Sequence, residues 1–344
     1  MVYDCLKLSD QYFLDYAEVS ADQRTIISGY DFYLFNYHPS TMHWLDTARL
    51  KKLKGLVFTI ILEVLPDDPF VMCPDNHFHG YCVLDPTIKS NNKKVFAFPR
   101  PLEIAEKTVP YREKEIPVIG SFGFATKGKG FQHVVEAVHK EFDQAVVKIN
   151  IPYGDFVPES KAYAAFLAGI CKQKAKPGIE VVVTHSYMTK EELINWCAQN
   201  TLNCFLYDRN LPGLAATTDQ AIVSGRPLSV SQNDTFRHIL SYIPPYPEIS
   251  LKQSIESSIV KVQMMQKDWS PGVFSAKFEV MLSQLLKKHS FGDKTSGEFV
   301  LPLLKKGIVE AIKKKYRKYK RYFNRKKLQH VFIAKKRIKD EELI

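Results

Sequence analysis

The sequence predicts an α/β protein built from two doubly wound domains and a basic tail. Three observations lead to this prediction. Strand-like and helix-like segments alternate along most of the chain, glycine-rich turns separate several of them, and basic residues collect near the C-terminus. The expected parts are residues 1–105, 106–290 and 291–344.

The first domain is expected to contain three strands, at Asp31–His38, Leu53–Val64 and Lys93–Glu103. The second of these is apolar for long enough to be buried on both faces of a sheet. Residues 39–53 have a helical pattern, whereas residues 65–81 are rich in Pro, Asp, Asn and Gly and predict a loop. We place the inter-domain linker near residues 100–117.

Strand-like and helix-like segments alternate more regularly in the second domain. Strands are predicted at 117–122, 145–152, 179–187, 201–208 and 226–231, and helices at 130–142, 160–175, 189–200 and 217–225. Thr189 followed by Glu192 predicts a capping box at the start of one helix. Five strands that alternate with four helices favour a parallel sheet, which binds ligands at the carboxyl ends of its strands.

The basic tail carries most of the charge. The chain has a net charge of +11, yet residues 305–339 hold sixteen Lys or Arg and one acid, so the rest of the chain carries −4. Apolar residues recur in the tail at helical spacing: Ile308, Ile312, Tyr316, Tyr319 and Phe323. This pattern fits a helix on an anionic membrane surface, contact with nucleic acid, or a solvated basic extension. The slightly acidic body argues against nucleic acid as the partner.

Other features of the sequence indicate a cytoplasmic protein, which would be peripheral to a membrane if the tail binds lipid. The chain lacks a long apolar run, its N-terminus lacks the apolar core of a signal peptide, and its six cysteines are scattered. The segment CPDNHFHGYC, residues 73–82, contains metal-binding residue types. Its two cysteines lie farther apart than the pairs of structural zinc sites, so we expect no metal there.

A glycine- and lysine-rich turn follows the first strand of the second domain, in IGSFGFATKGKGFQHVVEAV, residues 119–138. Backbone N–H groups at a helix N-terminus form an anion site, and glycines let the backbone approach a phosphate. The candidate residues are Gly123, Lys127, Gly128, Lys129 and Gly130. Gly130 replaces the Ser or Thr of a Walker A loop, so the turn is either a different phosphate site or an ordinary connection.

A second polar segment is expected at the same sheet edge. A strand ends at Asp208 and Arg209, and a turn through Gly213 and Leu214 leads to a helix with Thr218, Asp219 and Gln220 near its start. Because the carboxyl ends of parallel strands lie at one edge, these residues and the lysine turn are expected to converge.

Together these segments resemble the donor-binding half of GT-B glycosyltransferases, nearest to family 4. The resemblance rests on Lys129-Gly130 before a helix, on Gly213-Leu214, and on Gly225-Arg226-Pro227. It covers residues 117–240, and the first hundred residues only loosely. Gly123-Phe124 stands where the family has an arginine, and the family's two glutamates are replaced by residues near Asp208 or Asn210 and near Asp219 or Gln220.

The resemblance implies a GT-B fold with a reduced or truncated N-terminal acceptor domain, and a reaction that needs no cofactor or metal. A nucleotide diphosphate sugar would place its diphosphate on Lys129 and the adjoining glycines, and its sugar near Asp208. Its ribose or base would lie near Asp219 and Gln220. The acceptor would be a glycan or a lipid-linked molecule.

The expected catalytic residues are His38 and Asp208, and the reaction is either retaining or inverting. His38 follows a strand and is a suitable general base, although it also fits an ordinary loop histidine. The alternative function is that of a catalytically inactive GT-B-like binding protein that acts through its basic tail on a membrane or nucleic acid.

Overall fold

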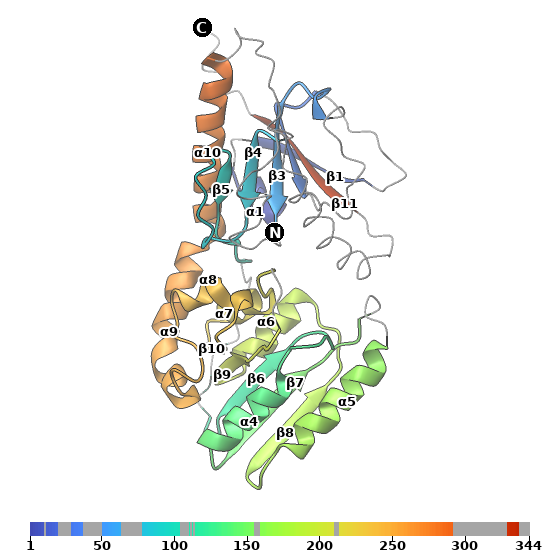
Figure 1. Cartoon of the computed structure of the whole chain (residues 1–344), viewed down its shortest axis with the longest axis vertical. Coiled ribbons are helices and arrows are strands. Elements are labelled where there is room, and N and C mark those ends of the chain that lie inside the picture. Colours follow the sequence, from blue (N-terminus) through green and yellow to red (C-terminus); the bar gives the residue numbers. More distant parts are fainter. Residues whose placement is uncertain are drawn as a thin grey trace, which may run out of the picture. The chain divides into compact units, whose positions relative to one another are not determined.

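The computed structural model describes residues 1–9, 12–19, 29–36, 50–62, 78–103, 110, 112, 114–154, 159–209, 213–291 and 329–336. The chain forms two compact units (Figure 1). Unit 1 comprises residues 1–98 and 274–344, and unit 2 comprises residues 99–273. The first boundary lies a few residues before the expected one. The second lies well before residue 290, because most of α10 (Pro271–Phe291) packs in unit 1 rather than in the second domain.

Unit 1 is built on a six-stranded sheet with the order β1-β11-β2-β3-β4-β5. Its strands are β1 (Tyr12–Val19), β2 (Phe32–Asn36), β3 (Leu56–Ile61), β4 (Gly80–Val83), β5 (Val95–Ala97) and β11 (Gln329–Lys336). Strands β2 to β5 are parallel, whereas β11 is antiparallel to both of its neighbours. The predicted strands at Asp31–His38, Leu53–Val64 and Lys93–Glu103 correspond to β2, β3 and β5.

Both faces of this sheet are buried at β2, β3 and β4. Phe32 and Phe58 meet Phe278 of α10 on one face, with ring centroids 6.0 and 6.2 Å apart. Tyr33 and Phe35 belong to a second apolar cluster on the other face. All six residues of β3 are buried, as its continuous apolar sequence predicts.

The structure differs from the expectation at both ends of the chain. The short helix α1 (Val2–Lys7) and β1 were not predicted, and β4 begins inside the segment expected to be a loop. Residues 329–336 form a strand where a helical tail was expected. Their run of Val331, Phe332 and Ile333 suits a strand, and β11 pairs with β1 on one side and β2 on the other. The helical stripe from Ile308 to Phe323 lies outside the described residues.

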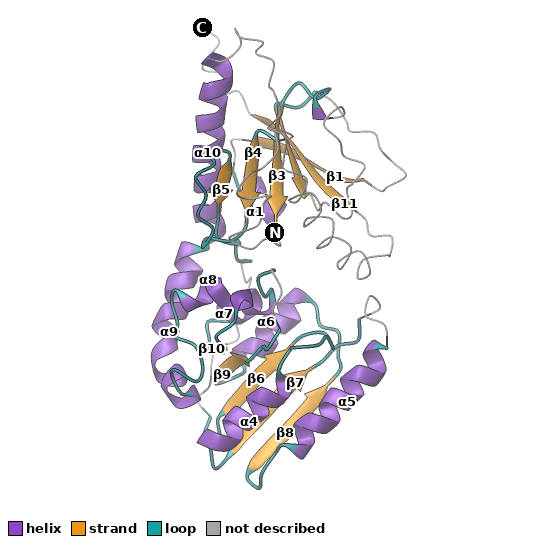
Figure 2. Cartoon of the chain, in the orientation of Figure 1, coloured by secondary structure: helices purple, strands orange, loops and turns teal. Residues whose placement is uncertain are grey.

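Unit 2 follows the prediction closely. Its strands are β6 (Val118–Phe122), β7 (Ala145–Asn150), β8 (Ile179–Thr184), β9 (Leu202–Phe205) and β10 (Leu228–Val230). Its helices are α4 (Phe131–Glu141), α5 (Ser160–Gln173), α6 (Lys190–Ala198), α7 (Thr217–Val223), α8 (Arg237–Leu240) and α9 (Leu251–Asp268), with a short 3-10 turn at Asp234–Phe236. The strands are parallel, in the order β10-β9-β6-β7-β8 (Figure 2). Thr189 and Glu192 form the predicted capping box of α6.

Buried polar side chains fix β9 beside the helices that flank it. The Asn200 amide donates to Asn203 at 2.8 Å, and the Asn203 amide contacts the carbonyl oxygen of Cys197 and the hydroxyl of Ser224 at 3.3 Å. Gln266 of α9 donates to the carbonyl oxygen of Ile222 at 2.8 Å. These bonds satisfy backbone and amide groups that would be costly to bury unpaired.

No helix among the described residues combines the length and apolarity needed to cross a bilayer.

We expect Gly120→Ala to destabilise the protein by about 1–3 kcal/mol, because an added Cβ would lie 1.9 Å from the buried Asn200 amide nitrogen. The matched control is Gly169→Ala in α5, where nothing lies within 4 Å of an added Cβ. Alanine there should stabilise the helix by about 0.5–1 kcal/mol. Denaturant unfolding of both variants measures the difference. Equal stabilities would contradict the packing at Gly120.

Candidate functional site

The candidate site lies at the point where the strand order of unit 2 reverses. β6 pairs with β7 on one side and with β9 on the other. The chain after β6 runs through α4 to β7, whereas the chain after β9 runs through α7 to β10, in the opposite direction along the sheet. The loops at the carboxyl ends of β6 and β9 therefore diverge and leave a crevice, which is where open α/β sheets bind their ligands.

The predicted lysine turn packs directly against the end of β9. Gly128 and Gly130 have φ values of 76° and 62°, and Gly130 is the N-cap of α4. A Cβ at Gly130 would lie 1.7 Å from the carbonyl oxygen of Leu206, and one at Gly128 would lie 2.4 Å from Cβ of Arg209. Glycine is required at both positions, because the conformation and the space each exclude a side chain.

Lys129 is folded back over this turn. Its Nζ donates to the Tyr207 hydroxyl at 3.0 Å and lies 4.5 Å from the centroid of the Tyr207 ring. A Cβ at Gly123, where φ is 148°, would lie 3.2 Å from the same nitrogen. Burial lowers the pKa of Lys129, and Arg209 lowers it further, while Tyr207 opposes the shift.

Arg209 lies against the same aromatic ring. Its guanidinium carbon is 5.2 Å from the Tyr207 centroid, and its Nε is buried with no hydrogen-bond partner. Among the described residues, no carboxylate forms an ion pair with Lys129 or Arg209. Two close cations without a carboxylate partner favour an anionic ligand between them.

Tyr207 was not predicted, although it connects the two loops. Its hydroxyl contacts Lys129 and also lies 2.9 Å from Oγ1 of Thr217 at the start of α7. The side chain is buried, and its ring lies 4.8 Å from that of Phe236. The sequence places Tyr207 at a strand end, directly before Asp208. A tyrosine also fits the apolar run of a buried strand, so its position did not identify it as a site residue.

Asp208 lies on the exposed side of the same cluster. Its N–H donates to the carbonyl oxygen of Gly128 at 3.2 Å, and its carboxylate lies 3.2 Å from Nε2 of His133 in the first turn of α4. The other His133 nitrogen is 3.2 Å from Glu136, whose second oxygen pairs with Lys174 at 2.7 Å. Lys174, and then His133, lower the pKa of Glu136. His133 was not predicted as a site residue.

The residues of α7 occupy a different environment from the lysine turn. Thr218 donates its hydroxyl to the carbonyl oxygen of Ala215 at 2.7 Å and lies 3.3 Å from Nε2 of the buried His238. Asp219 is buried, with Oδ2 3.4 Å from Nε of Arg100 and Oδ1 without a hydrogen-bond partner. Burial raises the pKa of Asp219 to about 6, against the opposing effect of Arg100. The sequence did not indicate that this carboxyl is internal.

The remaining predicted site residues are dispersed. Lys127 is exposed, Gly213 and Gln220 are half-buried, and Leu214 is buried. His38 and Asn210 lie outside the described residues, as do residues 73–77 of the metal-binding candidate. In the part of the chain that the structure describes, no cluster of three or more His, Cys, Asp or Glu side chains is arranged to hold a metal ion.

Aromatic side chains collect at the carboxyl ends of β6, β7 and β8. The rings of Tyr153 and His185 stack at 5.0 Å with an interplanar angle of 17°, and His185 is anchored to the carbonyl oxygen of Ile151. Tyr187 is 78% exposed, and its ring centroid lies 6.5 Å from that of Phe124. An exposed aromatic ring near a phosphate-binding turn can stack on a planar base.

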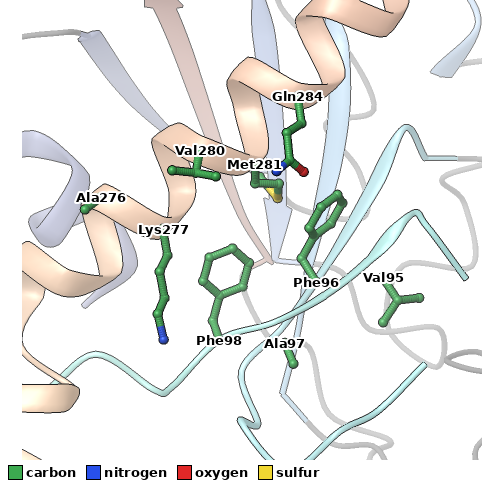
Figure 3. A pocket seen from close by; sticks show the side chains of 9 residues that line it. All are labelled: Val95, Phe96, Ala97, Phe98, Ala276, Lys277, Val280, Met281 and Gln284. Atoms are coloured by element: carbon green, nitrogen blue, oxygen red, sulfur yellow. The ribbon is translucent and has the colours of Figure 1, made fainter. Parts of the chain in front are cut away.

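Each unit also contains a hollow. In unit 2 a cavity of about 240 Å³ adjoins the Asp208–His133 pair and is lined by His133, Glu136, Ala137, Lys140, Leu206, Tyr207, Ser231 and Tyr246. In unit 1 an open groove of about 510 Å³ lies between β5 and α10, with Phe96, Phe98 and Met281 along it and Lys277 at its side (Figure 3). Lys277 is the only charged residue among those that line it, so this groove does not resemble a catalytic site.

No protein-family model matches the sequence, and no curated protein matches it in sequence. Solved structures do match the fold. A glycosyltransferase from Rickettsia africae has a TM-score of 0.53 at 12% identity, over 75% of this chain and 77% of that one. HepE of Anabaena, in complex with UDP and glucose, has a TM-score of 0.53 at 9% identity, over 74% and 78% of the two chains. A UDP-forming α,α-trehalose-phosphate synthase from Burkholderia vietnamiensis has a TM-score of 0.53 at 12% identity, over 72% of each.

These similarities establish the fold, which is the GT-B fold that the sequence predicted.

We expect the stability of the protein to fall through the pH range in which Asp219 ionises. A carboxyl whose folded pKa is raised to about 6 contributes stability below its ordinary value of 3.8, and this contribution is lost as the pH rises through 6. Asp219→Asn stays neutral, so relative to the wild type it should gain up to roughly 3 kcal/mol between pH 4 and pH 7.5. Denaturant unfolding across this range measures the change.

Asp234→Asn, at an exposed position, controls for the loss of one negative charge. A stability difference between wild type and Asp219→Asn that is constant with pH would contradict the burial of an ionisable Asp219.

Proposed function

We propose that this chain is a glycosyltransferase that moves a sugar from a nucleotide diphosphate sugar to a glycan or lipid-linked acceptor. The main support for the proposal is a pair of cations, Lys129 and Arg209, that lie on the Tyr207 ring. They lie where the strand order of the unit 2 sheet reverses, in a GT-B fold. A diphosphate bound there would neutralise both of them. It would also accept from backbone N–H groups at the start of α4, where the helix dipole is positive.

The nucleoside would extend along the sheet edge towards β7 and β8. In doubly wound sheets with this strand order, the phosphate lies at the first turn and the rest of the nucleotide lies across the neighbouring strand ends. Tyr187, which is exposed, and the half-buried Phe124 beside it offer aromatic surface in that direction. HepE, which has a similar fold, is known in complex with UDP and glucose, and this supports UDP as the first nucleotide to test.

Catalysis would depend mainly on stabilising the departing diphosphate. Positive charge that is already in place where negative charge develops lowers the barrier without reorganisation. We assign this charge to Lys129 and Arg209, and we propose that the reaction needs no metal ion. Asp208, beside the lysine turn, would face the transferred sugar, and His38 would take the acceptor proton in an inverting reaction. The proposal is compatible with retention and with inversion at the transferred carbon.

We also propose a relationship with family 4 of the GT-B enzymes. Lys129-Gly130 and Gly225-Arg226-Pro227 hold the positions that the resemblance requires, at the start of α4 and after the end of α7. Asp219 departs from the role suggested by that resemblance, because it is buried against Arg100. Gln220, which is half-buried and adjacent in α7, lies on the β9–β10 side of the diphosphate site. It would meet the ribose only if the nucleoside extends to that side, which is the alternative to a base at Tyr187.

The alternative is an inactive GT-B-like protein that acts through its basic residues 305–339 on a membrane or nucleic acid. Lys129 and Arg209 favour the enzyme, because their contacts with Tyr207 leave both positive charges without a carboxylate partner among the described residues, and a diphosphate would neutralise them. Nucleotide binding separates the two functions.

We expect one nucleotide among UDP, GDP and CMP, with their common sugar conjugates, to raise the melting temperature of the wild type. A ligand at 100 times its Kd stabilises a protein by about 2.7 kcal/mol, which a thermal shift assay detects. Lys129→Ala should lose most of this shift, whereas Lys127→Ala, which removes an exposed lysine from the same turn, should keep it. Absence of a shift with every nucleotide would favour the inactive binding protein.

We expect Tyr187→Ala to weaken nucleotide binding by about 5- to 150-fold, because base–aromatic stacking contributes about 1–3 kcal/mol. The same variant should bind inorganic diphosphate as the wild type does. Isothermal titration with both ligands provides the comparison. An unchanged nucleotide affinity would place the base elsewhere.

A further inference from the structure

The outer face of helix α5 is apolar, although it is exposed. A surface helix normally has polar residues on the side away from the core. Residues 162–171 of α5 read AYAAFLAGIC and include no charged side chain. Ala164, Leu167, Ala168 and Cys171 of this run are buried. The others form the α5 outer face: Ala162, Tyr163, Ala165, Phe166, Gly169 and Ile170.

Phe166 is the centre of this face. Its side chain is 61% exposed, and the ring of Tyr163 stacks beside it at 6.1 Å with an interplanar angle of 23°. Nothing lies within 4 Å of a Cβ added at Gly169, so the surface next to Phe166 is open. Leaving this much apolar surface in water is unfavourable, which implies that a partner covers it.

Lysines border both ends of the face. Lys161 precedes it and Lys172 follows it, and both are exposed. Residues 160–178 contain no acid, and the nearest acid in the sequence before them is the N-cap residue Glu159. Helices α9 and α6 of unit 2, in contrast, carry acidic residues. The exposed Val260 and Met264 of α9 share their helix with Glu256 and Asp268, and the first turn of α6 carries Glu191 and Glu192.

We propose that the α5 outer face inserts into the headgroup region of an anionic lipid bilayer. An interfacial helix has an apolar face that enters the boundary of the acyl chains, and basic residues beside it that pair with anionic headgroups. The α5 outer face has both features. α5 lies beside α4 on one face of the sheet (Figure 1), and this surface belongs to unit 2 alone.

The composition favours lipid over a protein partner. Protein interfaces are enriched in Tyr, Trp and Arg and depleted of Lys and Ala, whereas this surface combines alanines with a lysine border. Self-association is disfavoured as well. A two-fold symmetric contact pairs a patch with its own copy, which would bring the lysines of the two chains together.

The first test uses Phe166→Trp in the full-length chain, with vesicles of phosphatidylcholine and phosphatidylglycerol. Trp196 and Trp269 are buried, and Trp44, the third native tryptophan, lies outside the described residues. The spectrum of the wild type with the same vesicles is therefore subtracted, and the difference reports the new side chain. We expect a blue shift of its emission and quenching by brominated lipid. The matched control is Val260→Trp in α9, where the native side chain is 57% exposed, and its emission should not change.

The second test removes the border charges. Lys161→Gln with Lys172→Gln should lower the partition coefficient on anionic vesicles by about fivefold per lysine. Lys261→Gln with Lys267→Gln, two exposed positions on α9, should leave it unchanged. Vesicles of phosphatidylcholine alone should bind weakly, and binding to anionic vesicles should fall as salt is raised.

Three results would overturn the proposal. The Phe166→Trp variant could bind vesicles without any change in its emission, which would place the contact elsewhere, for example in residues 305–339. The protein could fail to bind anionic vesicles at all. The emission of the Phe166→Trp variant could instead shift with protein concentration in the absence of lipid, which would show that another copy of the chain covers the face.

Discussion

The close approach of the turn after β6 to the end of β9 is the constraint on which the candidate site depends. Two glycines with positive φ allow it, since side chains at Gly128 and Gly130 would occupy the space of Arg209 and of the Leu206 carbonyl group. The approach brings a lysine and an arginine from different loops onto one tyrosine ring. Like charges repel more strongly in a partly buried setting than in water, so the sheet must hold these two side chains together. The stability of the β6–β9 core is therefore a condition for the charge arrangement that the function needs.

Much of this arrangement followed from the sequence. All five strands of unit 2 and four of the six helices that the structure describes there were predicted, because parallel strands are apolar and the helices between them have a clear 3.6-residue period. The helices α8 and α9, which follow the last strand, were not predicted. The convergence of Lys129 with Asp208 and Arg209 followed from the rule that strand ends share an edge. Tyr207 and His133 could not be identified, because their roles depend on distances across the fold. Likewise, the burial of Asp219 depends on its pairing with Arg100 from a distant part of the chain.

Unit 1 was harder to predict because its sheet is assembled from the two ends of the sequence. β11 lies in a basic segment whose lysines and arginines indicated a tail, and its partners β1 and β2 lie roughly three hundred residues earlier. Sequence patterns report local periodicity, and pairing at such separation leaves no local signal. The same lack of a local signal led to the expectation of a reduced first domain. Strands near the N-terminus are completed by a helix and a strand from the C-terminal part of the chain, which were predicted to belong to other parts of the protein.

The insertion of β11 between β1 and β2 also sets an order of events during synthesis. Unit 2 is one continuous stretch, residues 99–273, and this stretch contains every strand of its sheet, so it can fold as soon as it leaves the ribosome. The central sheet of unit 1 cannot close until residue 336 has emerged, and until then β1 and β2 each have an open edge where β11 will pair. Open strand edges favour pairing with other chains. A nascent chain of this protein is therefore most vulnerable to misassembly in its first hundred residues, which are the earliest made and the last to be completed.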